Sequence, residues 1–381
     1  MNQNFVVGIL WFLCLGTRIL RGRADRRDHT PSRVLVVQMA KLGDMVCTTP
    51  VFHALKHSSC HPHVTVMGNK VNKELLVDNT DVDEYLVFSS VMSAYRLMHA
   101  GHFDAVIVVT PDVVSVALAY LAGIPFIAAP KVIGGYSPFE SLWYRSLRHI
   151  IGCAVAEHRI GNYAPREYLN LLKPLGIDVS DTRKHLAFSQ ESLKKVRLLF
   201  GNKEKGVLYV GMSPSAGNKL KNWGAERFAE LALRISRKYR VCIVVFGGER
   251  DREETTLMVR SLALPVSFLD LSRGLLIPEL KAAISLLDMF IAVDTGPIYI
   301  AEAFSVPTVD ILGPVAEGEQ APASEFNLVV LPPSPRVPQM RIMNVHGYNL
   351  AELKRQIDTT TIDSVYDACD HLLQKIARAH D

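Results

Sequence analysis

The chain has 381 residues and a formal net charge of +4. Its first 33 residues contain six arginines and two acidic residues, and the rest of the chain carries equal numbers of basic and acidic side chains. A neutral body excludes a protein that binds nucleic acid by broad phosphate neutralisation, and 49% hydrophobic with 21% charged residues excludes a disordered chain.

An apolar segment at residues 5–20 precedes most of these arginines. As a helix it would be about 24 Å long, which is shorter than the roughly 30 Å hydrocarbon core of a bilayer. A signal peptide has its positive charges before the apolar run, and here the order is reversed. We therefore expect residues 1–32 to form a short signal anchor or a shallowly inserted helix, followed by an arginine-rich collar on the cytoplasmic side of a membrane. A buried terminal helix is the alternative.

From residue 33 onward, short apolar runs alternate with helical stretches, a pattern typical of a parallel α/β sheet. The first series has predicted strands at 34–39, 64–67, 85–88, 105–109 and 125–128 and helices at 45–56, 71–78 and 113–122. The second series has strands at 207–212, 241–246, 266–269, 290–293 and 308–312 and helices at 225–238, 253–262 and 278–287.

A polar stretch at 178–184 separates the two series. We therefore expect two doubly wound domains, at residues 33–184 and 185–340, and a C-terminal tail and helix at 341–381 that pack back on the body. Such domains bind ligands at the carboxyl ends of their strands, so a ligand cleft is expected between them. Neither opening strand is followed by GxGxxG or a Walker lysine motif, which argues against a dinucleotide dehydrogenase and a P-loop enzyme.

The first strand leads directly into AKLGDMVCTTPVFHALK. Gly43 lies at the predicted strand-to-helix turn, where it would permit close backbone approach and an unusual φ. Asp44 follows and has two interpretations. Either it caps the helix, which contributes ~1 kcal/mol, or it faces the cleft and takes a proton from an attacking hydroxyl.

A second motif, VGMSPSAGNKLKNWGAERFAELA, opens the second series. Its strand ends in small and hydroxyl residues, including Ser213 and Ser215, and Lys219 and Lys221 follow. Small residues expose backbone N–H groups to phosphate oxygens, and a lysine supplies a point charge. The motif therefore predicts a phosphate site, with a solvated polar loop as the alternative.

A third motif, MFIAVDTGPIYIAEAFSVPTVDILGP, predicts a strand, the turn Asp294-Thr295-Gly296 and a short helix with Pro297 near its start. The N–H groups at this helix N-terminus would form an anion site. A carboxylate is a poor phosphate ligand, so we expect Asp294 to orient the turn or to contact a sugar hydroxyl.

These three motifs, together with NYAPREYLNLLKPLGI between them, resemble glycosyltransferase family 9, the lipopolysaccharide heptosyltransferases. The similar segments cover most of residues 33–315. The resemblance implies an α/β protein with the GT-B fold, in which two Rossmann-like domains face a central cleft. The N-terminal domain would bind the acceptor and the C-terminal domain the nucleotide-sugar donor. It also implies an inverting, metal-independent enzyme without a cofactor, which moves heptose from ADP-heptose onto a lipopolysaccharide core or related glycolipid.

The resemblance further implies roles for individual residues. Asp44 matches the family's catalytic aspartate, with Lys41 and Gly43 on the acceptor side of the turn. Asp251, with Glu253 as the alternative, falls where family members hold the nucleotide ribose. The residues implied on the donor side are Ser213, Ser215, Lys221, Asp251, Asp294, Thr295 and Gly296.

The chain departs from the family pattern at several positions, which affects the identity of donor and acceptor. Ala40 and Lys41 stand where many members have paired serines, Pro297 replaces a leucine and Tyr299 replaces a histidine. A differently specific or non-catalytic GT-B paralogue and a nucleotide-sugar epimerase are the alternatives. A lipid-linked acceptor would place the protein in the cytoplasm, held at the inner membrane surface by its N-terminal segment.

Other groups of side chains are more ambiguous. The sequence KHSSCHPH resembles a metal-binding tract, but its proline and its helix-to-strand position predict an exposed turn for His57, Cys60, His61 and His63. His53 is expected to pack against neighbours or to meet solvent. Arg145 and Arg148 either meet an anionic acceptor or lie on a solvated helix face.

Overall fold

The computed structural model describes residues 3–21, 30–202, 204–262, 266–321, 324–343 and 347–380. The chain divides into two compact units. The first extends to His185 and includes the returning residues 342 and 343, and the second begins at Leu186 and contains the C-terminal helix. The arginines at positions 23, 26 and 27 of the expected collar lie outside the described residues.

The first unit is built on a parallel sheet with the strand order β3-β2-β1-β4-β5-β6. Strand β1 lies in the middle of this sheet and is covered on both faces, so its residues 34–37 are all buried. The strands are β1 Arg33–Val37, β2 His63–Gly68, β3 Glu84–Val87, β4 Ala105–Val108, β5 Phe126–Ile133 and β6 Ala154–Arg159. The α-helices are α1 Gln3–Arg21, α2 Leu42–Lys56, α3 Lys70–Leu75, α4 Val91–Ala100, α5 Val113–Leu121, α6 Leu142–Ile151 and α7 Ala164–Leu169.

The second unit contains a parallel sheet with the order β12-β11-β10-β7-β8-β9. Helix α14 contributes Val365, Cys369, Leu372 and Leu373 to its core and packs against α9, β11 and β12. The strands are β7 Leu208–Ser213, β8 Val241–Val245, β9 Ser267–Asp270, β10 Met289–Val293, β11 Thr308–Ile311 and β12 Asn327–Val330. The α-helices are α8 Gln190–Phe200, α9 Ala225–Lys238, α10 Arg252–Ser261, α11 Ile277–Ile284, α12 Gly296–Ala303, α13 Leu350–Thr359 and α14 Ile362–His380.

Both sheets have the Rossmann strand order, in which the chain runs outward in one direction and then returns to the centre to run outward in the other. The order reverses between β1 and β4 in the first sheet and between β7 and β10 in the second. Ligands of such sheets bind at these switch points, outside the carboxyl ends of the strands. The segments that follow β1, β7 and β10 therefore carry the candidate site residues.

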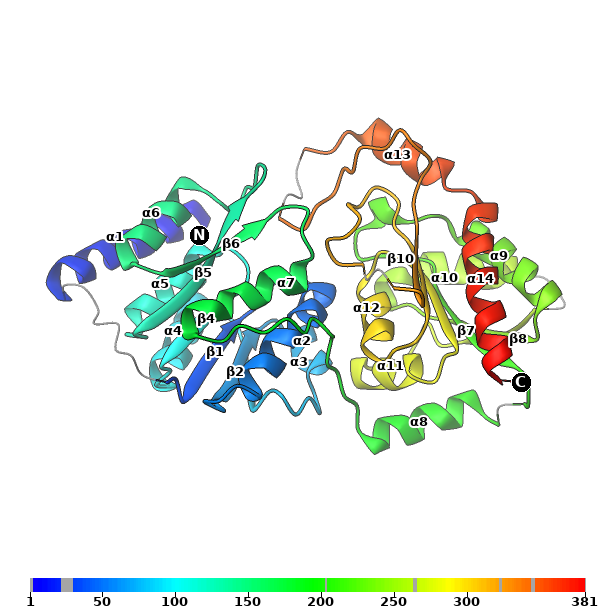
Figure 1. Cartoon of the computed structure of the whole chain (residues 1–381), viewed down its shortest axis with the longest axis horizontal. Helices are drawn as coiled ribbons and strands as arrows, with labels where there is room; N and C mark the ends of the chain where they lie inside the picture. The colour runs from blue at the N-terminus through cyan, green and yellow to red at the C-terminus, as the bar shows by residue number, and fades with distance from the viewer. Residues whose placement is uncertain are drawn as a thin grey trace. The chain divides into compact units, whose positions relative to one another are not determined.

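Helix α1 packs along α5 and α6 of its own unit (Figure 1). Leu10 and Cys14 are buried there, and burial raises the pKa of the Cys14 thiol to about 12. The indole N–H of Trp11 donates to Ser146 Oγ at 2.9 Å. Another face of α1 exposes large apolar side chains, namely Phe5, Ile9, Phe12, Leu13, Ile19 and Leu20. Within the described part of the chain, no helix is both long and apolar enough to cross a membrane.

A buried histidine in β6 makes the stability of the first unit depend on pH. Burial lowers the pKa of His158 to about 4, although the nearby Glu167 carboxylate partly opposes the shift. The unfolded chain then binds the proton more readily than the native chain, so stability is full above about pH 6.5 and is lost as the pH falls toward 4. We expect acidification from about pH 7 to about pH 5 to lower the free energy of unfolding by about 2 kcal/mol through this residue.

Urea unfolding of the native chain and of His158→Gln at both pH values measures this contribution. His158→Gln should remove about 2 kcal/mol of the difference in unfolding free energy between the two pH values. Equal pH dependence in the two proteins would contradict a neutral buried imidazole.

Candidate active site

The loop between β1 and α2 is held by side-chain amides. The buried Gln38 side chain accepts from the Ala40 N–H at 3.1 Å and donates to Thr48 Oγ1 at 3.0 Å. The Ala40 carbonyl accepts from the amides of Asn69 and Asn72, each at 3.0 Å. These bonds fix the start of α2 at the switch point of the first sheet.

Lys41 is the N-cap residue of α2, so Gly43 and Asp44 lie in the first helical turn. The expectation of an unusual φ at Gly43 is wrong, because Gly43 lies within α2 and is not a positive-φ position. The N-cap interpretation of Asp44 is wrong as well, since Asp44 is the third helical residue. Its side chain is half-buried near the positive end of the helix dipole, which favours a carboxylate there. Lys41 is exposed.

In the second unit, Lys221 links the second motif to the third. Its ammonium donates to the Asp294 carboxylate at 2.6 Å and to the Asp294 carbonyl at 2.5 Å. The hydroxyl of the buried Tyr299 donates to the other oxygen of the same carboxylate. Asp294 is only 4% exposed, so this carboxylate orients the turn from inside the protein. Tyr299, the departure from the family's histidine, is thus a partner of Asp294.

A second acidic residue, Asp310, lies near the Lys221–Asp294 pair. Asp310 in β11 is buried, and neither of its carboxylate oxygens has a hydrogen-bond partner among the described residues. Burial, together with the nearby charge of Asp294, raises the pKa of Asp310 well above its usual range, while Lys221 partly opposes the shift. The protein interior therefore disfavours ionisation of Asp310, and Asp294 is the carboxylate that forms the ion pair with Lys221.

The neighbouring lysine belongs to a different cluster. Lys219 donates to Ser215 Oγ at 2.6 Å and to Asp251 Oδ1 at 2.9 Å, and it pairs with Glu254 at 2.9 Å. Burial raises the pKa of Asp251, but hydrogen bonds from Lys219, the Gly248 N–H and Ser215 outweigh it and the net pKa is lowered. Asp251 is therefore an ionised group at the carboxyl end of β8, beside the loop that follows β7.

The other donor-side residues differ in accessibility. Thr295 is the N-cap of α12, Gly296 is its first residue, and both are partly exposed. Ser213 is buried at the end of β7, and its hydroxyl donates to the Ser215 carbonyl at 3.4 Å. Glu253, the alternative to Asp251, is exposed on α10.

Arg148 does not lie on a solvated helix face. Its side chain is 8% exposed, and its guanidinium pairs with Glu140 at 2.7 Å and donates to the Pro130 carbonyl at 2.5 Å. Arg145 Nε donates to the Glu140 carbonyl at 2.9 Å. The bonds of Arg148 hold α6 to β5, whereas Arg145 is exposed, as expected for a solvated helix face.

The sequence model of glycosyltransferase family 9 (heptosyltransferase) matches residues 91–347, which is more than half of the chain. The chain belongs to glycosyltransferase family 9. The matched part of this family 9 protein includes the Lys221 and Asp294 motifs and begins after Asp44.

Relatives of known function and structure agree with this assignment. Lipopolysaccharide heptosyltransferase 3 of Escherichia coli K12 is 24% identical over 292 residues, covering 71% of this chain and 79% of the relative. The family 9 crystal structure from Veillonella parvula is similar with a TM-score of 0.70 at 20% identity, covering 90% of this chain and 97% of that one. Escherichia coli ADP-heptose lipopolysaccharide heptosyltransferase II gives a TM-score of 0.69 at 16% identity, covering 90% and 99%.

These findings confirm three expectations from the sequence: membership of family 9, the GT-B fold with two Rossmann-like domains, and glycosyltransferase activity. They also place the protein among the heptosyltransferases of lipopolysaccharide biosynthesis.

Proposed function

We propose that this protein transfers heptose from ADP-heptose to a lipopolysaccharide core or a related glycolipid, with inversion at the anomeric carbon and without a metal ion. The family 9 match carries the proposal. The donor nucleotide is inferred from a structural relative that is an ADP-heptose heptosyltransferase. The positions of Asp44 at one switch point and of Lys221 and Asp294 at the other support the mechanism.

In this mechanism, Asp44 accepts the proton of the acceptor hydroxyl as that oxygen bonds to the anomeric carbon. The bond from the anomeric carbon to the diphosphate breaks on the opposite face, and the diphosphate leaves with the electron pair. An ammonium has three N–H donors, and Lys221 directs two of them to Asp294. The third would meet a diphosphate oxygen, together with the N–H groups near Thr295 and Gly296. Fixed donors of this kind stabilise developing charge in place of a metal ion.

On the donor side, Asp251 would accept a hydrogen bond from the nucleotide ribose, with Ser213 and Ser215 lining the phosphate loop. On the acceptor side, Lys41 and Gly43 would flank the attacking hydroxyl. A thermal-shift panel of ADP-, UDP-, GDP- and dTDP-linked sugars tests the choice of donor. ADP-heptose should stabilise the chain by about 2.7 kcal/mol at 100 times its Kd. If only another nucleotide-sugar stabilises the chain, that compound is the donor and ADP-heptose is not.

The exposed face of α1 would hold the enzyme at the cytoplasmic surface of the inner membrane, where a lipid-linked acceptor lies. Phe5, Ile9 and Phe12 recur on this face at helical spacing. Trp143 of α6 lies beside it, with its ring 5.7 Å from that of Trp11, and tryptophan favours the membrane interface. The arginines that follow residue 17 would attract anionic headgroups.

Replacement of Phe12 by aspartate tests this surface. Burial of a phenylalanine in an apolar phase contributes about 1.5–3 kcal/mol, so Phe12→Asp should weaken binding to anionic vesicles by about tenfold or more. Leu198→Asp is the matched control, because Leu198 is an exposed apolar residue on α8 of the other unit. Co-sedimentation measures the vesicle binding of both variants and of the native chain. Equal vesicle binding by Phe12→Asp and the native chain would rule out this face.

A further inference from the structure

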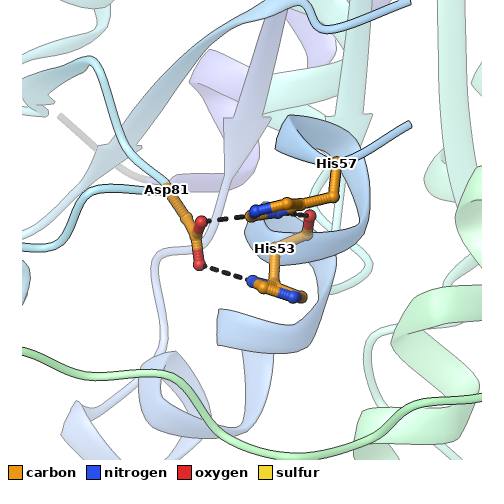
Figure 2. A group of neighbouring side chains, drawn as sticks. All are labelled: His53, His57 and Asp81. Atoms are coloured by element: carbon orange, nitrogen blue, oxygen red, sulfur yellow. Dashed lines mark hydrogen bonds and ion pairs between the residues drawn. The ribbon is translucent and has the colours of Figure 1, made fainter. Parts of the chain in front are cut away.

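The structure places two histidines and one aspartate of the first unit in a single cluster. His53 lies in the last turn of α2 and His57, four residues later, is the C-cap residue of the same helix, so the two side chains lie on one side of its end. Asp81 comes from the segment between α3 and β3, and Figure 2 shows its carboxylate directed at both imidazoles. His53 Nδ1 lies 3.0 Å from Asp81 Oδ2, and His57 Nδ1 lies 3.7 Å from Asp81 Oδ1.

His57 Nδ1 also donates to the His53 carbonyl at 3.0 Å, so a metal ion would bind the other ring nitrogen of His57 or replace this hydrogen bond. Zinc binds histidine nitrogen and carboxylate oxygen at about 2.0–2.2 Å, which puts tetrahedral ligand atoms roughly 3.4 Å apart. One candidate atom from each of the three residues lies within 4.8 Å of the others. Two histidines and one carboxylate are a known donor set for first-row divalent ions, and they leave a coordination position for water.

In the part of the chain that the structure describes, no lysine or arginine forms an ion pair with this cluster. The Asp81 side chain is 8% exposed, and its ion-pair partners among the described residues are the two imidazoles. A divalent ion would place a permanent positive charge beside this buried carboxylate.

Surrounding hydrogen bonds hold the ligands in place, as outer contacts do in metal sites. The Asp81 N–H donates to Asn79 Oδ1 at 2.9 Å, and the Asn79 amide donates to the His185 carbonyl at 2.9 Å. The His185 N–H donates to Thr49 Oγ1 on α2 at 2.8 Å. The His185 ring stacks on His53 with centroids 3.8 Å apart.

We propose that His53, His57 and Asp81 bind a divalent first-row metal ion, with Zn²⁺ as the preferred ion. It ties the end of α2 to the segment before β3. His53 is nine residues beyond Asp44, or about 14 Å along the helix axis, so the ion takes no part in sugar transfer. Of the histidine and cysteine tract in KHSSCHPH, only His57 belongs to this cluster. Cys60 Sγ lies beside Ser58 Oγ at 3.0 Å, and His61 Nδ1 lies beside the Lys56 carbonyl at 3.0 Å.

The test titrates the full chain, stripped of metal with a chelator, with Zn²⁺ alone. The native chain should bind one ion. His53→Gln and Asp81→Asn should each raise the Kd for Zn²⁺ at least about 100-fold, because loss of outer contacts alone costs 10–100-fold. Cys60→Ser and His61→Asn are the matched controls and should keep the native Kd. His61 has a φ of 40°, which asparagine tolerates.

Two further readouts complete the test. Co²⁺ bound to the native chain should give visible bands without a thiolate charge-transfer band. The native chain and His53→Gln should have similar unfolding temperatures in the chelator, because the glutamine amide can still donate to Asp81. His53→Gln therefore decides the outcome if Asp81→Asn does not fold. A native chain that binds no Zn²⁺, a native Kd in His53→Gln, or loss of binding in Cys60→Ser would each overturn the proposal.

Discussion

Asp44→Asn is expected to lower the turnover of sugar transfer by 10²–10⁴-fold while the Kd for the donor stays unchanged. The asparagine side chain keeps the shape of the carboxylate but cannot accept the proton of the acceptor hydroxyl, and a positioned general base contributes that factor. Donor binding should persist because Lys221 and Asp294 lie in the other unit. Initial rates with saturating donor and acceptor measure the first quantity, and calorimetric titration of the donor measures the second.

Asp112→Asn is the matched control for this variant. Asp112 also follows a central strand and lies at the start of a helix, α5. Its two carboxylate oxygens accept from the N–H groups of Val114 and Ser115 at 3.2 and 2.9 Å, which is an N-cap role, and asparagine, whose amide oxygen can keep one of these bonds, is among the residues preferred at this position. The control should therefore retain native turnover. Near-native turnover in Asp44→Asn would show that another group is the base.

Lys221→Met should destabilise the second unit and abolish donor binding together. The lysine side chain is 18% exposed and the Asp294 side chain 5%. Removal of one partner from a buried pair leaves an uncompensated charge, at a cost of about 3 kcal/mol. Of the two partners of the Asp294 carboxylate described above, Tyr299 alone then remains. The turn that begins α12 should therefore also lose its fixed geometry. Urea unfolding and calorimetric titration with the donor nucleotide measure the two effects.

Lys219→Met separates this effect from the general loss of a positive charge. Lys219 lies two residues away in the same short helical turn, but its side chain is 44% exposed. Exposed ion pairs contribute about 0–1 kcal/mol, so this variant should lose little stability. Equal destabilisation by the two substitutions would contradict a special role for the Lys221–Asp294 pair.

The central strands were predictable because they are continuous apolar runs. The VLVV of β1 and the FIAV of β10 are buried throughout, and a parallel strand covered on both faces has this pattern. Strands β6 and β12 were not predicted. Both lie at the edge of a sheet, and β6 alternates buried with exposed residues, so AVAEHR has no apolar run.

The candidate site was predictable in its segments but not in its contacts. The motifs located Lys221 and Asp294, yet the two residues are 73 positions apart and meet because β7 pairs with β10. Local sequence likewise suggested a turn glycine at Gly43, whereas α2 begins one residue earlier. His53 and Asp81 were missed as partners, because only the packing of α2 beside the α3–β3 segment brings them together.

Mass spectrometry of a set of truncated lipopolysaccharide cores, after incubation with ADP-heptose and the purified chain in EDTA, tests sugar transfer most directly. One of the cores should gain a single heptose, and NMR of the product should show the anomeric configuration inverted relative to the donor. Acceptors that all remain unchanged, or a donor sugar that is isomerised without any acceptor, would contradict a heptosyltransferase.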